Sequence, residues 1–171
     1  MREEALIYLA HMAEKSSSIA EIGSWKGRST VAMAENTQGI VYAIDTWEGS
    51  DDPPHRIELA QHPSGWLFEE FSRNVAHLTN VIPCQMTSLC AAKHFLQTGE
   101  KFDFIFIDAS HDYENVHADI LAWRELLTPN GVFAGHDYAE WAPGVVRAVG
   151  ELVPVFRIVG VTIWTTENLH G

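Results

Sequence analysis

The sequence predicts a doubly wound α/β fold, with a mostly parallel sheet between layers of helices and an antiparallel hairpin strand near its C-terminal end. Short apolar runs alternate with segments in which apolar residues recur every three or four positions, as in strands joined by crossover helices. The run FIFI at 104–107 is apolar at every position, as expected for a strand covered on both faces. Two later apolar runs, 155–160 and 161–166, are close enough to pair as a hairpin through Gly160.

The first part of the chain predicts a helix and then a strand–helix–strand unit. Apolar residues from Arg2 to about Lys15 recur at spacings of three and four, which line one face of a helix. An apolar stretch closed by glycine, 17–23, and a run rich in β-branched residues, 39–45, predict strands on either side of a second helical segment, 27–37. A unit of this kind places its two strands parallel to each other.

The following segments continue the alternation of helices and strands. Pro83 in the third strand indicates a strand end or an irregularity. The sequence TPNG at 128–131 predicts a turn before the fifth strand. In order, we expect a helix at 68–78, a strand at 80–88, a helix at 88–98, a strand at 102–108, a helix at 113–127, a strand at 131–137 and a short helix at 144–152.

Residues 47–66 form the one long stretch without a clear period. The proline and glycine positions in this stretch predict a loop or a lid over a ligand site, although part of it is compatible with a helix. An alternative of equal weight is that this stretch is a surface loop without function, which carries His55, His62 and Trp66. The whole chain, 1–171, is predicted to be a single domain because its length suits one hydrophobic core.

Composition limits the kinds of partner that we expect. Lys and Arg number 11 and Asp and Glu number 23, which gives a formal net charge of -12. Such a charge repels the phosphates of nucleic acids and the anionic lipids of a membrane surface. A small-molecule or protein partner is the better expectation, and the oligomeric state stays open, with a homo-oligomer compatible with the sequence.

The cysteines and the apolar runs predict a cytoplasmic location. Cys84 and Cys90 have no second pair, so they form neither a disulfide framework nor a zinc pattern, and a reducing compartment fits. No apolar run approaches the roughly 20 residues of a membrane span. Charged residues interrupt the first 18 residues, which argues against a signal peptide.

A glycine-containing turn, EIGSWKGRS, follows the first strand, where open α/β sheets bind their ligands. Trp25 stands where a dinucleotide fingerprint has its second glycine, so close contact with a pyrophosphate is not expected. A nucleotide without phosphates is the better candidate. Asp45 ends the next strand, 22 positions after Gly23, where a carboxylate can accept hydrogen bonds from ribose hydroxyls. The alternative is that Gly23 and Gly27 serve packing and that Asp45 is a solvated strand terminus.

These residues resemble the class I S-adenosylmethionine-dependent methyltransferases, which have a Rossmann-like fold. The first motif of that family, E-x-G-x-x-x-G-x-S, is matched by Glu21, Gly23, Gly27 and Ser29, and its second-strand acid by Asp45. The resemblance covers nearly the whole chain and implies that the turn holds the methionine part of the cofactor. The cofactor-binding residues that it implies are Glu21, Gly23, Ser24, Gly27, Ser29, Asp45, Thr46, Met86, Ser88 and Asp108.

Two copies of His-Asp-Tyr, 111–113 and 136–138, follow the fourth and fifth strands. Asp108 and Asp137 close these strands, and adjacent strands are about 4.8 Å apart, so the two carboxylates can meet at one point. Converging carboxylates repel each other unless they are protonated or bridged, and a divalent cation such as magnesium is the economical explanation. His111 can reach back over the strand end as a general base, with Asp108 as the second catalytic residue.

This pattern is similar to that of metal-dependent small-molecule and sugar O-methyltransferases, in which acids on the fourth and fifth strands bind magnesium and a histidine deprotonates the acceptor hydroxyl. The departure is His136, a third candidate ligand that suits zinc, iron or manganese better than magnesium. Plainer interpretations stay open: Asp108 contacts only the cofactor's ammonium group, and His136 is a capped loop residue. His117 and Asp119 are predicted to lie on the surface, and Trp123 in the core.

The sequence as a whole predicts methyl transfer from S-adenosylmethionine to a hydroxyl of a small-molecule acceptor, with or without a divalent metal. One alternative is a non-catalytic module that binds S-adenosylmethionine or a partner protein. A nicotinamide-dependent oxidoreductase is a further alternative, against which Trp25 and the missing third glycine count. A metal-dependent hydrolase would leave the glycine turn and Asp45 unexplained.

Overall fold

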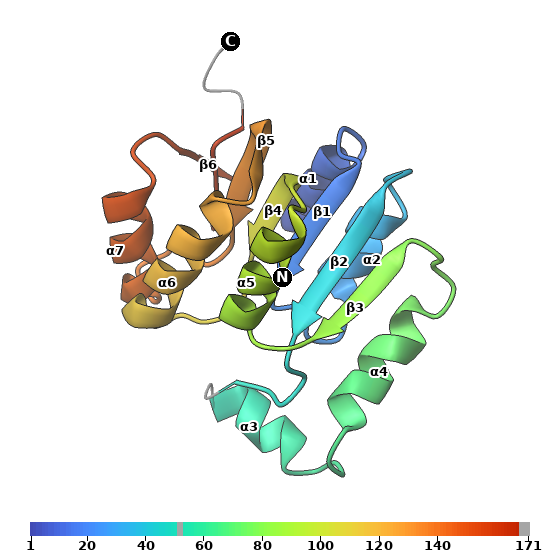
Figure 1. The fold of residues 1–171 in the computed structure, drawn as a ribbon. Helices are drawn as coiled ribbons and strands as arrows, with labels where there is room; N and C mark the ends of the chain where they lie inside the picture. Colours follow the sequence, from blue (N-terminus) through green and yellow to red (C-terminus); the bar gives the residue numbers. More distant parts are fainter. Residues whose placement is uncertain (51–52, 168–171) are drawn as a thin grey trace.

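The computed structural model describes residues 1–50 and 53–167. Within these residues, one sheet has the strand order β3-β2-β1-β4-β5-β7-β6 (Figure 1). The strands from β3 to β5 are parallel, and β7 runs antiparallel to both of its neighbours. The predicted fold class is therefore confirmed, hairpin included. The strands are β1 (Ser18–Ile22), β2 (Ile40–Asp45), β3 (Val81–Gln85), β4 (Phe102–Ile107), β5 (Leu127–Gly135), β6 (Arg157–Val159) and β7 (Ile163–Thr165).

Helices cover both faces of the sheet (Figure 1). The helices α5, α6 and α7 pack on one face, α1 and α2 on the other, and α4 packs beside β2. In the described part of the chain, no helix is long and apolar enough to cross a membrane. The helices are α1 (Glu3–Ala13), α2 (Arg28–Ala34), α3 (Pro53–Leu59), α4 (Trp66–Val75), α5 (Ser88–Thr98), α6 (Tyr113–Arg124) and α7 (Pro143–Leu152).

Strand β4 is the apolar centre of the sheet, as its sequence predicts. Ile105 and Ile107 pack in one core cluster with α5, α6 and α7. Phe104 and Phe106 pack in the opposite cluster with α1 and α2. All four side chains are buried, because both faces of the strand are covered.

Two local predictions differ from the structure. Pro83 lies in the middle of β3 rather than at its end; β3 pairs only with β2 in the described sheet, and an outermost strand tolerates the missing N–H. The predicted turn at 128–131 belongs to β5. Its residues are accommodated by a register shift between the pairs Phe102–Leu127 and Phe104–Val132.

Helix α3 occupies part of the aperiodic segment 47–66 and lies beyond the carboxyl end of β2 (Figure 1). None of its residues is buried. Two contacts join α3 to the turn after β1: His55 stacks on Trp25 with 4.1 Å between ring centroids, and Glu58 forms an ion pair with Lys26. Residues 51 and 52 of this segment lie outside the described residues. A role of this helix as a lid stays a prediction.

Asp119 was predicted to lie on the surface, and this prediction is wrong. It is 5% exposed, because the inward face of α6 follows the spacing Val116, Asp119, Ile120 and Trp123. Burial raises the pKa of Asp119 to about 6. Trp123 is fully buried, as predicted, whereas His117, also predicted to be exposed, is half-buried.

Gly23 packs against the end of the neighbouring strand β4. Its φ is +92°, and a Cβ at this position would lie 2.2 Å from the backbone oxygen of Asp108. Hydrogen bonds fix both strands here, from Gly23 N–H to the Ile44 oxygen and from Asp108 N–H to the Ile22 oxygen. Only glycine fits both this φ and this close approach.

We expect Gly23→Ala to lower the free energy of unfolding by about 3 kcal/mol, because left-handed strain and a clash with backbone add. Gly65→Ala is the matched control, with a φ of +85° and no atom within 4 Å of an added Cβ. The control should lose about 1 kcal/mol from strain alone. Urea unfolding of both variants measures the difference, and equal losses would contradict the close approach.

We also expect Asp119→Asn to alter the pH dependence of stability. The unfolded pKa of aspartate is about 3.9, and the folded value is about 6. The folded state therefore binds more protons between these values, so stability falls as pH rises from about 4 to about 6. Relative to wild type, the free energy of unfolding of Asp119→Asn should increase by about 1 kcal/mol between pH 5 and 7.5. Urea unfolding at both pH values checks this, and a constant difference would refute it.

Candidate functional site

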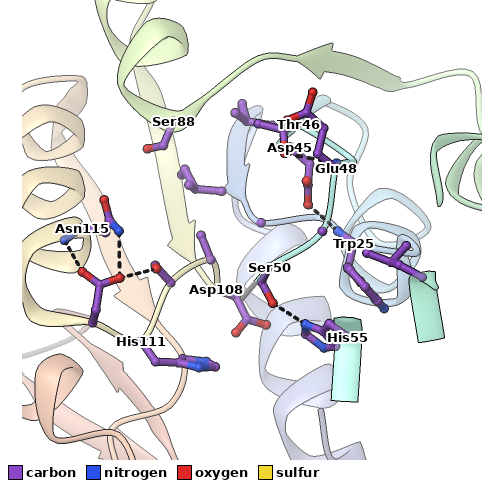
Figure 2. Close-up of a pocket in the computed structure, with 18 of the residues that line it drawn as sticks. Trp25, Asp45, Thr46, Glu48, Ser50, His55, Ser88, Asp108, His111 and Asn115 are labelled. Carbon is purple, nitrogen blue, oxygen red and sulfur yellow. Dashed lines mark hydrogen bonds between the residues drawn. The ribbon is translucent and has the colours of Figure 1, made fainter. Parts of the chain in front are cut away.

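The carboxyl ends of β1, β2 and β4 open onto a cleft of about 940 Å³ (Figure 2). This is the edge of the sheet where parallel strands present their ends together. The predicted base His111 lines the cleft as well. Of the predicted cofactor-binding residues, those that line it are Gly23, Asp45, Thr46, Met86, Ser88 and Asp108.

The Asp45 carboxylate organises the backbone on one side of this cleft. Its Oδ2 accepts the Trp25 N–H at 2.8 Å, and its Oδ1 accepts the Trp47 N–H at 2.8 Å. The Trp47 indole N–H donates to the Trp25 oxygen at 2.8 Å. Both tryptophans have positive φ, +48° for Trp25 and +54° for Trp47. The carboxylate thus holds two turns in place, and each of its oxygens keeps a lone pair for a ligand hydroxyl.

Glu21 lies behind the glycine turn and does not line this cleft. It is fully buried, and the Thr30 hydroxyl of α2 donates to its Oε2. Burial raises the pKa of this carboxyl. Gly27 does not line this cleft either, because it packs against Phe71 and Val75 of α4. Both residues support the turn from behind.

Asp108, His136 and Asp137 converge at the ends of β4 and β5. One potential ligand atom from each lies within 4.8 Å of the others. His136 Nδ1 is 2.6 Å from Asp137 Oδ1 and 3.5 Å from Asp108 Oδ1. His111 Nε2 is 2.8 Å from Asp137 Oδ2, and the Thr162 hydroxyl is 3.0 Å from His136 Nε2. The two predicted carboxylates therefore meet, with an imidazole between them.

One detail of that prediction needs correction. Asp137 was expected to be the terminal residue of the fifth strand, but β5 ends at Gly135. Asp137 lies two residues beyond, with a left-handed φ of +61°. This backbone turn directs the Asp137 carboxylate toward His111 and His136, and it could not be predicted from a strand pattern.

Burial and mutual charge alter the pKa values in this cluster. Burial raises the pKa of Asp108; the charges of Asp137 and Glu21 raise it further, while His136 opposes them. Burial would also raise the pKa of Asp137, but hydrogen bonds from His111 and His136, with their charges, together hold it well below its usual range. The pKa of His136 is raised, because its bond to Asp137 and the nearby carboxylates outweigh burial. The cluster therefore favours a positive charge between the two carboxylates.

A second cleft, of about 500 Å³, lies on the other side of the cluster. Ser24 and Ser29 line it, together with His136 and Asp137. Both clefts share a wall formed by Gly23, Trp25, His55, Asp108, Ala109 and His111. The two clefts therefore meet at the carboxylate cluster.

Sequence reasoning did not single out Trp141 or Lys26 among the side chains of the second cleft. Trp141 is 62% exposed, and its ring meets that of His111 edge-on with 5.3 Å between centroids. Lys26 lines the same cleft. The signal available for Trp141 was its place in the loop after β5, where such folds carry specificity.

The cluster has the donor set of a divalent metal site. It offers two carboxylates and one imidazole, which suit manganese, iron or zinc better than magnesium. The imidazole of His136 is itself held by Thr162, as outer hydrogen bonds commonly hold metal ligands.

The fold is similar to that of solved methyltransferases with low sequence identity. An O-methyltransferase from Bacillus cereus in complex with SAH matches with a TM-score of 0.70 at 18% identity, over 96% of this chain and 81% of that one. The calicheamicin methyltransferase CalS11 matches with a TM-score of 0.70 at 15% identity, over 94% of this chain and 76% of that one. The O-methyltransferase NovP matches with a TM-score of 0.69 at 16% identity, over 95% of this chain and 78% of that one. These likenesses concern the fold alone.

Family membership comes from the sequence. Among curated proteins, none matches this chain significantly. A family model described as a methyltransferase domain matches residues 20–138, which include the glycine turn, Asp45 and the carboxylate cluster. The match covers most of the chain. The protein therefore belongs to the methyltransferase domain family, and its fold is that of the class I S-adenosylmethionine-dependent methyltransferases.

Proposed function

We propose that this protein transfers a methyl group from S-adenosylmethionine to a hydroxyl of a small-molecule acceptor. The observation that carries the proposal is the meeting of the two clefts at Asp108 and His111. A donor in the larger cleft and an acceptor in the smaller one would meet where Asp108 and His111 line both clefts. Holding two reactants in line supplies about 7 to 11 kcal/mol of a barrier in well-oriented systems.

The proposed cofactor site uses the larger cleft. Asp45 and Thr46 would bind the ribose, and Met86 and Ser88 would lie at the adenine. Gly23 and Asp108, which line both clefts, would hold the methionine part where the clefts meet. Ser24 and Ser29 would reach this part from the smaller cleft, and Glu21 and Gly27 would support the turn from behind. S-adenosylmethionine supplies an electrophilic methyl group on its sulfonium.

The proposed general base is His111. Its Nε2 is 2.8 Å from the Asp137 carboxylate, which stabilises the tautomer with the proton on Nε2. Nδ1 is then the basic nitrogen that takes the acceptor's proton. Asp137 fixes the ring orientation and stabilises the imidazolium that results. This is the arrangement by which a carboxylate supports a histidine base in other enzymes.

A divalent metal, if used, would be held by Asp108, His136 and Asp137. A metal supplies positive charge that lowers the pKa of a nearby hydroxyl. Asp108 and Asp137 also have a role without a metal, because both carboxylates lie beside the His136 imidazole and raise its pKa.

Charge and neighbours support a small acceptor. The net charge of -12 disfavours nucleic acid and anionic membranes as partners. One solved neighbour, CalS11, is described as a TDP-rhamnose 3'-O-methyltransferase. We also propose that the protein is a single domain located in the cytoplasm, and a homo-oligomer is compatible with the sequence.

We expect His111→Ala to lower kcat by about 10²- to 10⁴-fold, because the acceptor loses its base. The dissociation constant of S-adenosylhomocysteine should change by less than about twofold, since the cofactor residues are intact. His117→Ala is the control, because His117 is a half-buried histidine of α6 that lines neither cleft. Turnover is measured as S-adenosylhomocysteine release with a panel of hydroxylated acceptors. Unchanged turnover in His111→Ala would remove the base assignment.

The metal proposal is tested by titrating the protein with manganese in a calorimeter. We expect one binding isotherm that is lost in Asp137→Asn, because the variant replaces a carboxylate ligand by a neutral amide. Asp103→Asn is the matched control, since Asp103 bonds to the Ser17 N–H and lies in neither cleft. An isotherm that survives in Asp137→Asn would place the metal elsewhere.

A further inference from the structure

Two serines that line the larger cleft donate their hydroxyl hydrogens to aspartates of α6 and its cap. Ser88 Oγ donates to Asp119 Oδ1 at 2.5 Å. Ser110 Oγ donates to Asp112 Oδ2 at 2.7 Å, and Asp112 is the N-cap of α6. Both serines line the cleft. In Figure 2, Ser88 lies on the side where α5 begins, away from Trp25 and Asp45.

The hydrogen-bonding capacity of Ser88 is therefore restricted. A hydroxyl has one hydrogen and two lone pairs. The hydrogen is committed to Asp119, and one lone pair accepts the Trp123 indole N–H at 2.8 Å. What Ser88 presents to the cleft is the second lone pair, so it can accept a hydrogen bond there but not donate one.

Asp119 is not needed to fill the inward face of α6. Its neighbours on that face, Val116, Ile120 and Trp123, are apolar and fully buried. A buried carboxylate costs free energy that an apolar or amide side chain would not. The Asp119 carboxylate orients the Ser88 hydroxyl, because an ionised carboxylate can only accept a hydrogen bond and therefore fixes the direction of the hydroxyl hydrogen.

We propose that Asp119, acting through Ser88, makes the part of the cleft beside Ser88 selective for a hydrogen-bond donor, namely the 6-amino group of adenine rather than the 6-oxo group of a deaminated purine. The inference rests on the proposed function, in which this cleft binds S-adenosylmethionine. Asp119 is a positioning residue, since Ser88 makes the contact. Asp112 restrains Ser110 in the same way.

Asn115 also lines the larger cleft and donates one amide N–H to Asp112. Its amide can both donate and accept, so it does not by itself distinguish an amino from an oxo group. The discrimination therefore depends on the serines and on the aspartates that orient them.

The test compares the binding of S-adenosylhomocysteine and S-inosylhomocysteine by calorimetry at pH 7.5. Wild type should prefer the adenosyl compound by about tenfold or more, since one well-formed hydrogen bond is lost and two acceptors oppose each other. In Asp119→Asn, the Asn amide can donate to Ser88 Oγ, which frees the Ser88 hydroxyl hydrogen. Ser88 can then also donate to a 6-oxo group, so the preference for the adenosyl compound should fall by about three- to tenfold. In Ser88→Ala, the preference for the adenosyl compound should fall by a similar factor.

The double variant Asp119→Asn, Ser88→Ala separates positioning from general structure. If Asp119 acts through Ser88, the double variant should have the same preference as Ser88→Ala alone. Asp103 accepts the Ser17 N–H and lines neither cleft, so Asp103→Asn should keep the wild-type preference for the adenosyl compound. Thermal unfolding confirms that each variant is folded, and Asp119→Ser replaces Asp119→Asn if the latter does not fold.

The outcomes are distinct. If wild type binds neither compound, the proposed function is wrong. If wild type binds S-adenosylhomocysteine but Asp119→Asn weakens both compounds by the same factor, Asp119 has only a structural role and the inference is wrong. Additive losses in the double variant would also refute it, since Asp119 would then act independently of Ser88.

Discussion

The close approach of two backbones, at Gly23 and Asp108, is the constraint on which the rest of the site depends. β1 and β4 are neighbours in the middle of the sheet, and the turn after β1 folds over the end of β4 with no room for a Cβ. This approach brings the glycine turn and the Asp108 carboxylate to the same point. Since both clefts are lined by Gly23 and Asp108, neither would keep its shape if the turn were displaced.

The charges of the site are balanced inside the protein. The chain carries a formal net charge of -12, yet histidines lie beside both Asp108 and Asp137, the carboxylates that follow β4 and β5. Asp137 adopts a left-handed backbone, which is unusual for a residue other than glycine, and its hydrogen bonds with two imidazoles offset the strain. The polar groups of the cluster thus hold one another in place.

The strand ends could be predicted from the sequence because apolar runs followed by a carboxylate mark where a parallel strand meets solvent. This reasoning found Asp45, Asp108 and the convergence of Asp108 with Asp137. It did not find the hydrogen bond between His111 and Asp137, which depends on a left-handed turn that no strand or helix pattern encodes. The positive φ of Trp25 was also unpredictable, because it is imposed by a carboxylate at the end of another strand.

The error on Asp119 has a different origin, since the information was in the sequence. Val116, Asp119, Ile120 and Trp123 follow the spacing of one helical face, and three of the four are apolar. A carboxylate within such a face is more informative than one outside it, because its burial has to be compensated by a partner. The partner here is Ser88, which comes from a different helix and is therefore invisible to local periodicity.

The wall shared by the two clefts has a thermodynamic consequence. Asp108, Ala109 and His111 line both clefts, so a ligand in one cleft would lie beside part of the surface that a ligand in the other would meet. Any change that binding at one cleft makes to the affinity of the other is the same factor in both directions. For two adjoining clefts of this kind, an affinity measured with one cleft empty is related to the affinity with both filled by that coupling factor.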